Sequence, residues 1–331
     1  MKRTAILGTG HYVPPRVVTN QELEKLMDTT DEWIVQRTGI RERRFVDPGV
    51  GPAELAENAA RAAVEDAALR IQDIDFIILA TLSPQHNFPG TSCFLQEKLG
   101  HPGIGALDIR TQCTGFLYAL SIADQFIKTG MYQRILVVGA EVHSTGIDLS
   151  TRGRDVAVLF GDGAGAFVLG ASDDPNRGIL STHLHADGRF ARDLWLEAPG
   201  SVFQPRMTVE MVTEGKCYPQ MNGKKVFTSA VKKFPEVMRE ALVSNKKSKD
   251  DVDLYILHQA NLRIVQAAAD LMEIPQEKFF NNIERYGNTT AASIPIAFNE
   301  AKQAGRIKNG DLVMLAAFGS GYTWASALLR M

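Results

Sequence analysis

Short, continuously apolar segments alternate with longer helical patterns along this chain, and that alternation constrains its fold more than any other feature. Residues 75–81 and 134–139 are apolar runs of the kind found in strands buried on both faces of a sheet. An alanine-rich helical pattern covers residues 52–69, and a pattern that is apolar on most sides covers residues 113–128. Strands and helices in this alternation predict an α/β fold with layers of helices on a mixed sheet.

The second half of the chain repeats the same rhythm. Helices are expected at 226–243, 261–272 and 290–304, and strands at 252–257 and 311–317. Near the start, Thr19 to Glu22 and Thr29 to Glu32 have the spacing of capping boxes that begin short helices. We detect no clear internal sequence repeat, so the rhythm alone does not prove that the two halves share one fold.

Composition excludes several classes of protein. With 331 residues, of which 45% are hydrophobic, the chain can build one large or two fused domains. A net charge of −2 provides no bulk attraction to nucleic acid, and no apolar run reaches membrane-spanning length or resembles a secretion signal. Cys93, Cys113 and Cys217 form no close pair and no metal-ligand spacing, which predicts a cytoplasmic protein without a bound metal.

Cys113 is the first candidate for chemistry. It lies where the strand pattern ending near residue 110 runs directly into a helix. The backbone N–H groups and the dipole at a helix N-terminus favour an anion, so we expect the pKa of this thiol to be lowered, roughly to 3.5–7.5. A thiol of that kind is a usable nucleophile at neutral pH. The alternative is a buried structural cysteine, because free cysteines are among the most buried residues.

His258 and Asn288 lie at similar junctions in the second half. His258 follows an apolar strand and precedes a helix, and Asn288 occupies a Gly-Asn turn before the next helix. A single histidine after a strand is commonly a core residue, and a single Gly-Asn is commonly just a turn. Because Cys113, His258 and Asn288 all lie at element ends, the sequence predicts that they converge on one pocket.

Three motifs together resemble a known family. Cys113-Thr114-Gly115-Phe116, His258-Gln259-Ala260-Asn261 and Gly287-Asn288-Thr289 are similar to the active-site motifs of β-ketoacyl-acyl-carrier-protein synthase III, the initiating condensing enzyme of bacterial fatty acid synthesis. Further similarities are Asp31-Glu32-Trp33-Ile34, the run from Arg37 to Arg43, Phe160-Gly161-Asp162-Gly163, and the run from Ala317 to Trp324. The resemblance covers about residues 4–330, with the motifs in the family's order.

This resemblance implies a thiolase-like fold, in which two similar βα halves form a layered α-β-α-β-α core with mixed sheets. The first half, residues 1–175, would carry the nucleophilic cysteine, and the second half, residues 176–331, would carry the histidine and the asparagine. The family also implies a homodimer. Residues 160–166 lack the Lys-Ser/Thr of a phosphate-binding loop and are read as a tight structural turn near the active site.

The resemblance also implies a reaction. Cys113 would accept an acyl group from acyl-CoA, and malonyl-acyl carrier protein would then lose CO₂ and condense with it to give a β-ketoacyl product. His258 and the Asn288 amide would stabilise the enolate oxyanion. The backbone N–H groups of Cys113 and Ser320 would form a second oxyanion hole. No metal or redox cofactor is implied.

Substrate contacts follow from the same resemblance. The residues implied in binding acyl-CoA or lining its pocket are Trp33, Arg37, Phe88, Arg152, Asn261 and Phe318. Arg263, Lys232 and Lys233 would dock the acidic carrier protein. The alternative for Trp33 is packing against the core, and the alternative for the lysines is a solvated face.

Two positions depart from the family pattern. Ser320 stands where a glycine or an alanine is common, and it would be strained if the position needed positive φ. Gln112 stands where an alanine is common, which puts the choice of primer in doubt. The irregular segment 189–223 is either a surface excursion or a cap over the acyl tunnel, and such a cap could lie at a subunit interface.

Two other functions remain open from the sequence. A specialised relative of the same fold would make a secondary metabolite or transfer acyl groups to oxygen or nitrogen. A cysteine hydrolase would use the order Cys, His, Asn, but the residues around Cys113 lack the papain signature. The sequence does not specify the length or branching of the primer, or the pathway.

Overall fold

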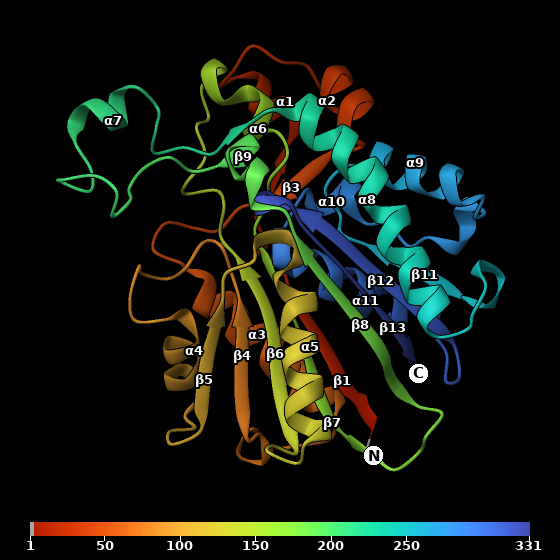
Figure 1. Cartoon of the computed structure of the whole chain (residues 1–331). Helices are drawn as coiled ribbons and strands as arrows, with labels where there is room; N and C mark the ends of the chain where they lie inside the picture. The colour runs from red at the N-terminus through yellow and green to blue at the C-terminus, as the bar shows by residue number, and fades with distance from the viewer. Residues whose placement is uncertain (1–2) are drawn as a thin grey trace.

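The computed structural model describes residues 3–331 and confirms the predicted α/β fold. Two β-sheets form its framework (Figure 1). The first sheet contains, in spatial order, β1 (Arg3–Tyr12), β7 (Gly163–Ser172), β6 (Arg134–Glu141), β4 (Phe76–Ala80) and β5 (Gly105–Ile109). The second contains β11 (Leu254–Leu257), β12 (Leu312–Gly319), β13 (Thr323–Arg330) and β8 (Gly178–Ala186). The predicted strands thus form, with ends shifted by one or two residues.

The two sheets have the same strand topology, although the sequence shows no clear repeat. In the first sheet β4 pairs parallel with β6, β6 antiparallel with β7, and β7 antiparallel with β1. In the second, β11, β12, β13 and β8 repeat these directions in the same order. A parallel bridge between Tyr255 and Phe279 lies where β5 lies in the first sheet. The chain therefore consists of two similar halves, and it passes from one sheet to the other between Ser172 and Gly178.

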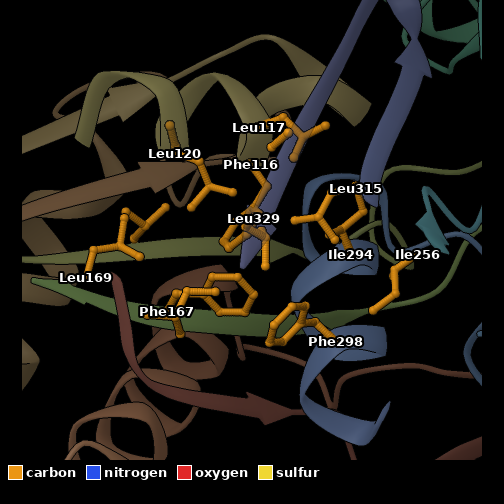
Figure 2. Close-up of a cluster of buried hydrophobic side chains, with 14 of the residues drawn as sticks. Phe116, Leu117, Leu120, Phe167, Leu169, Ile256, Ile294, Phe298, Leu315 and Leu329 are labelled. Atoms are coloured by element: carbon orange, nitrogen blue, oxygen red, sulfur yellow. The ribbon is translucent and has the colours of Figure 1, made fainter. Parts of the chain in front are cut away.

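Two helices lie between the sheets and form the central layer. They are α5 (Gly115–Lys128) and α11 (Ser293–Gln303), and each is buried along most of its length. Figure 2 shows Phe116 and Leu120 of α5 and Ile294 and Phe298 of α11 packed with side chains of both sheets. Phe167 of β7 contacts Phe116 edge to face at 4.9 Å between ring centroids and Phe298 at 4.7 Å. Burial on both sides explains why the α5 sequence is apolar nearly all round.

Helices also cover the outer face of each sheet. These helices are α3 (Pro52–Asp66) and α4 (Thr91–Leu99) on the first sheet, and α8 (Gly223–Ser244) and α9 (Leu262–Met272) on the second. The helices predicted at 52–69, 226–243 and 261–272 are thus confirmed. The five layers are helix, sheet, helix, sheet, helix, as expected for the thiolase-like core.

A smaller subdomain follows β1 in sequence and packs near the top of Figure 1. It contains β2 (Val17–Thr19), α1 (Asn20–Glu24), α2 (Asp31–Thr38) and β3 (Glu42–Arg44), together with α6 (Arg154–Ala157) and α10 (Ile283–Tyr286) from later in the chain. The capping box of α1 is present at Thr19 and Glu22. Helix α2 is capped instead by Thr30, whose hydroxyl accepts the Trp33 N–H, so the box predicted from Thr29 is wrong by one residue.

Residues 189–223 form an excursion that stands out from the body of the molecule (Figure 1). The excursion contains β9 (Leu194–Trp195), α7 (Val209–Thr213) and β10 (Gln220–Met221), and β9 pairs with β10. The part between the two strands exposes several apolar side chains, among them Val202 (85% exposed) and Val209 (78%). Among the described residues, no helix combines the length and the hydrophobicity that a membrane span requires.

Candidate active site

Cys113, His258 and Asn288 line one cavity of about 500 Å³. Cys113 precedes α5, His258 directly follows β11, and Asn288 precedes α11. Equivalent elements of the two halves end at the same place, and this brings the three side chains together at the buried end of the cavity. The predicted convergence is therefore confirmed.

Cys113 lies in a tight turn rather than in the first turn of α5. Residues Gln112–Thr114 form a 3₁₀ turn, and α5 begins at Gly115. Gln112 has φ 47°, a left-handed conformation that a non-glycine residue adopts at a cost. The Thr114 hydroxyl lies 2.7 Å from Thr111 O and 2.8 Å from Thr323 Oγ1, and the second contact anchors the turn to β13.

The expectation of a lowered thiol pKa is wrong. Burial raises the pKa of Cys113 to about 12, and the nearby Glu141 carboxylate acts in the same direction. The backbone N–H groups of Ser320 and of Cys113 itself lower the pKa, but they do not outweigh burial. Cys113 is therefore a thiol at neutral pH in the unliganded protein, and a reaction at its sulfur must include removal of the proton.

Those two N–H groups are hydrogen-bond donors beside the sulfur, where the predicted oxyanion hole would lie. Ser320 is absent from the residues with positive φ, so its side chain imposes no left-handed strain; Gly321, with φ 77°, takes that conformation instead. The Ser320 hydroxyl donates to the backbone carbonyl of Leu194 in β9. This departure from the family pattern thus fastens the excursion to the turn beside Cys113.

His258 is buried and neutral. Burial lowers its pKa to about 3, because the charged imidazolium would lose its hydration. Its Nδ1 lies 2.7 Å from the Ser293 hydroxyl. Its Nε2 is buried without a hydrogen-bond partner among residues 3–331, the Cys113 sulfur included. A neutral imidazole whose one ring nitrogen is held and whose other is unpaired in a cavity is available to bind a substrate oxygen.

Asn288 is oriented by its own backbone neighbourhood. Its Oδ1 accepts the Thr290 N–H at 2.8 Å, which turns the NH₂ group away from that backbone. Asn288 N donates to Leu159 O at 2.7 Å, and Gly161 N donates to Asn288 O at 3.1 Å. The turn predicted around Gly161 is therefore structural, as expected, and it fixes the asparagine.

The outer part of the cavity carries aromatic and basic side chains. Two guanidinium groups lie within cation–π distance of the Trp33 ring, that of Arg37 at 4.6 Å and that of Arg154 at 5.1 Å from the ring centroid. Arg37, Arg263 and Phe318 line the cavity as well. Asn261 also lines it, but its side chain caps α9 by accepting the Arg263 N–H and donates to Arg37 O. Trp33, Arg37, Asn261, Arg263 and Phe318 thus all line the cavity that holds Cys113, and their roles in binding remain predictions.

Other predicted contact residues lie outside the cavity wall. Arg152 binds Asp148 and the carbonyl of Thr213, so its guanidinium holds the excursion. Phe88 is 81% exposed on a loop and does not line the cavity of its own chain. Lys233 pairs with Glu236 and lies over the Trp324 ring, and Lys232 is exposed beside it on α8. Their binding roles remain predictions.

Sequence reasoning missed several cavity residues. Lys224 and Phe227 begin α8 at the cavity, and Leu194 and Met221 bring both strands of the excursion into its wall. The excursion thus takes part in the cavity as well as standing out from the surface. Lys224 was identifiable only as one lysine among many, because its position depends on how α8 is docked.

Glu141 was also missed. It ends β6 and is fully buried, and burial raises its pKa to about 7. The side chain accepts hydrogen bonds from the Ser83 hydroxyl at 2.6 Å and from the backbone of Leu82 and Ser83. Glu141 therefore holds the loop that follows β4 and adds negative potential near Cys113. No group of three or more His, Cys, Asp or Glu suited to a metal ion occurs within residues 3–331.

The paired halves, with reactive residues at the ends of equivalent elements, are the architecture of the thiolase-fold condensing enzymes. Residues 107–188 match the family model "3-Oxoacyl-[acyl-carrier-protein (ACP)] synthase III", and residues 242–331 match the model of its C-terminal part. A β-ketoacyl-[acyl-carrier-protein] synthase III from Alkalilimnicola ehrlichii is 46% identical over 100% of both chains. The chain belongs to the β-ketoacyl-acyl-carrier-protein synthase III family.

Solved structures agree with this assignment. The 3-oxoacyl-[acyl-carrier-protein] synthase III from Aquifex aeolicus has a TM-score of 0.91 and 44% identity, over 99% of this chain and 100% of its own. The corresponding enzyme from Thermus thermophilus has a TM-score of 0.91 and 39% identity, over 99% of each chain. The chain is thus an acyltransferase of the condensing type.

Proposed function

We propose that this enzyme starts fatty acid synthesis by condensing an acyl-CoA primer with malonyl-acyl carrier protein. The observation that carries the proposal is the shared cavity, where a thiol, an unpaired imidazole nitrogen and an oriented amide meet. No metal or redox cofactor is needed, because decarboxylation itself supplies the carbanion.

In the first half-reaction the Cys113 sulfur attacks the thioester carbonyl of acyl-CoA. The bond between the carbonyl carbon and the CoA sulfur breaks, and the proton lost by Cys113 ends on the released CoA thiol. The Ser320 and Cys113 N–H groups, which face the sulfur, would stabilise the tetrahedral oxyanion. Gly319 lets this backbone approach the cysteine closely.

In the second half-reaction malonyl-acyl carrier protein loses CO₂, and the electron pair of the broken C–C bond becomes an enolate. Neutral His258 and the Asn288 amide would donate to its oxygen, each donor contributing about 10²–10³ in rate. The enolate carbon attacks acyl-Cys113, the new C–C bond forms, and the Cys113 thiolate leaves and takes up a proton. The product is a β-ketoacyl thioester on the carrier protein.

The charge and lining of the cavity suit both substrates. Arg37, Lys224 and Arg263 are exposed at its outer part, where they would pair with the phosphates of CoA or of the carrier's prosthetic arm. Phe227, Phe318 and Met221 offer apolar walls to the arm that reaches the thiol. We propose that the same entrance serves acyl-CoA first and the acyl carrier protein second.

A cysteine hydrolase is not favoured by this geometry. Papain-like chemistry depends on a cysteine and a histidine that form a hydrogen-bonded pair. His258 Nε2 makes no such bond to Cys113 here, and its lowered pKa opposes an imidazolium partner. Both observations suit an oxyanion donor better than a general base for hydrolysis.

Intact-protein mass spectrometry tests the proposal. The protein is incubated with an equimolar panel of acyl-CoAs, beside Cys113→Ala and, as a matched control, Cys93→Ala. Wild type and Cys93→Ala should gain one acyl group, and Cys113→Ala should gain none. The mass of the adduct identifies the preferred primer. Addition of malonyl-acyl carrier protein should then discharge the adduct and release a β-ketoacyl thioester.

An adduct on Cys113→Ala would refute the assignment of the nucleophile. An adduct that water discharges as fast as malonyl-acyl carrier protein does would support the hydrolase instead. If no acyl-CoA reacts but acyl carrier protein thioesters do, the primer is carrier-bound and the enzyme is a specialised relative.

We further propose a homodimer located in the cytoplasm. Phe88, Val202 and Val209 expose large apolar surfaces, and β5 is an edge strand whose outer side is unpaired within the described chain. Phe88 would line a cavity only if a second copy supplied it. The three cysteines are unpaired, in keeping with a reducing compartment. Sedimentation equilibrium of wild type and Phe88→Ala measures the subunit number; a monomeric wild type would refute the dimer.

A further inference from the structure

Ser293 is the only residue among 3–331 that contacts His258 Nδ1 by a hydrogen bond, and its place in the reaction is unassigned. It is the first residue of α11 and is buried. Its Oγ lies 2.7 Å from Nδ1, 2.9 Å from Thr290 O and 3.4 Å from Gln259 N. One hydroxyl thus faces two possible acceptors and one backbone donor.

The proton of this hydroxyl decides which nitrogen of His258 carries hydrogen. A neutral imidazole has one N–H, and its other nitrogen is an acceptor. If Ser293 donates to Thr290 O, Nδ1 must donate to Ser293, and Nε2 faces the cavity as a bare acceptor. If Ser293 donates to Nδ1, Nε2 carries the hydrogen and faces the cavity as a donor.

In the second arrangement each polar group around Ser293 keeps a partner, and only Nε2, which faces the cavity, is left without one. Thr290 O already accepts the backbone N–H of Ser293, so it keeps a partner when the hydroxyl turns away. The Ser293 oxygen then still accepts the N–H of Gln259. The shorter of the two contacts, 2.7 Å against 2.9 Å, is also the one to Nδ1.

The chemistry of the enolate requires the same arrangement. An oxyanion is stabilised by hydrogen-bond donors, and a bare Nε2 lone pair would repel it. Burial keeps His258 neutral, so protonation on both nitrogens does not provide the donor. The hydrogen must therefore lie on Nε2 while Nδ1 accepts.

We propose that Ser293 is a positioning residue that donates to Nδ1 of His258 and so holds the neutral imidazole with its hydrogen on Nε2, aimed at the enolate oxygen. The inference rests on the proposed condensation. It assigns Ser293 to the malonyl half-reaction alone, because acyl transfer to Cys113 uses backbone donors.

The variant test compares Ser293→Ala with Ser293→Cys, which keeps the size and a weak donor. Ser293→Ala should lose about 10²-fold in condensation with malonyl-acyl carrier protein, the size of one lost oxyanion donor. Its self-acylation with acyl-CoA, measured by intact mass, should be retained, and this retention also reports an intact fold. Ser293→Cys should fall between Ser293→Ala and wild type.

Ser326→Ala is the matched control, because Ser326 is equally buried and its hydroxyl donates to Val237 O at 3.0 Å, outside the cavity. It should keep the wild-type ratio of condensation to acylation. Equal losses of both half-reactions in Ser293→Ala would mean a merely structural role, and wild-type rates of both half-reactions would also overturn the proposal.

The tautomer of His258 can also be observed directly, in wild type and in Ser293→Ala. In protein labelled with ¹⁵N in its seven histidines, the His258 signals are assigned by their absence from His258→Ala. Wild type should show a protonated Nε2 and a bare Nδ1, and Ser293→Ala should show a larger share of the other tautomer. A proton on Nδ1 in wild type would overturn the inference. Failure of wild type to condense at all would instead refute the proposed function.

Discussion

Gly319 lies directly against Cys113. A β-carbon at Gly319 would fall 2.5 Å from the Cys113 β-carbon and 2.8 Å from its sulfur, closer than atoms of these kinds approach. The glycine thus permits the strand end that carries the Ser320 N–H to reach the thiol. The Ser320 donor and the Cys113 nucleophile come from different halves of the chain, and this contact joins them.

We expect Gly319→Ala to lose self-acylation by at least about 10²-fold, because the added methyl must displace either the sulfur or the Ser320 donor. Intact-protein mass after timed exposure to acyl-CoA measures the rate. Gly188→Ala is the control, since a β-carbon there has no heavy atom within 4 Å. Normal acylation of Gly319→Ala would show that the turn moves without cost.

The raised pKa of Cys113 predicts how its reactivity depends on pH. Between pH 6 and 9.5 the thiolate fraction of a thiol with a pKa of about 12 rises about tenfold per pH unit, without a plateau. The rate of iodoacetamide alkylation at Cys113 should follow that rise. Exposed Cys93 in the same protein is the internal reference, and peptide mass mapping separates the two. A plateau for Cys113 below pH 8 would contradict the raised pKa.

The hydrogen bond from Ser320 to the excursion predicts that this residue, which lies beside Cys113, also holds the excursion closed. The Ser320 hydroxyl donates to Leu194 O, and Leu194 lines the cavity. Loss of one such bond costs about 1 kcal/mol, so Ser320→Ala should open the excursion about fivefold more often. Trypsin cleavage after the exposed Arg206 should accelerate accordingly, as measured by gel densitometry.

Ser201→Ala, at the exposed tip of the same excursion, should be cleaved at the wild-type rate. Equal cleavage of Ser320→Ala and wild type would mean that other contacts hold the strand. The Tyr322 hydroxyl, which donates to Asp193 Oδ2 at 3.1 Å, is the next such contact.

The order and type of the main elements were predictable because each carries a local pattern. The buried strands read as apolar runs, and the caps at Thr19 and Asn261 use side chains that occur at helix starts. Cys113, His258 and Asn288 were predictable because each lies at an element end in a motif shared with a family. These features need only neighbours in the sequence.

The properties of the site depend on distant contacts and were not predictable in that way. The thiol pKa is set by burial under Gly319 and by Glu141, neither of which is near Cys113 in the chain. Arg152 was predicted at the substrate but is held by Thr213 O of the excursion. Lys224 reaches the cavity only because α8 packs across the second sheet.

From the position of Arg263 at the cavity we predict that its positive charge attracts the acidic carrier protein. Arg263 lines the outer cavity beside Arg37, with its guanidinium 5.4 Å from the Phe227 ring centroid. Arg263→Glu should raise KM for malonyl-acyl carrier protein about tenfold, and the effect should weaken at high salt because the attraction is screened. Steady-state kinetics at two salt concentrations measure both.

Arg239→Glu reverses a charge on α8 away from the cavity and should leave this KM unchanged. Acyl-CoA loading by Arg263→Glu should change less than KM for the carrier protein. An unchanged KM would remove Arg263 from the docking surface.

The two proposed enolate donors predict a separation of half-reactions. His258→Ala and Asn288→Ala each remove one donor from the cavity but leave the Cys113 thiol and the backbone N–H groups beside it. Both variants should therefore still self-acylate with acyl-CoA, yet lose about 10²–10³ in condensation with malonyl-acyl carrier protein. In Cys113→Ala the donors remain, so malonyl decarboxylation should persist without condensation.

His101→Ala is the control for loss of a histidine, because the His101 ring contacts Ile74 O at 3.0 Å and lies away from the cavity. Normal condensation by His258→Ala or by Asn288→Ala would remove the substituted residue from the donor pair. Loss of acylation by His258→Ala would make His258 the group that takes the Cys113 proton.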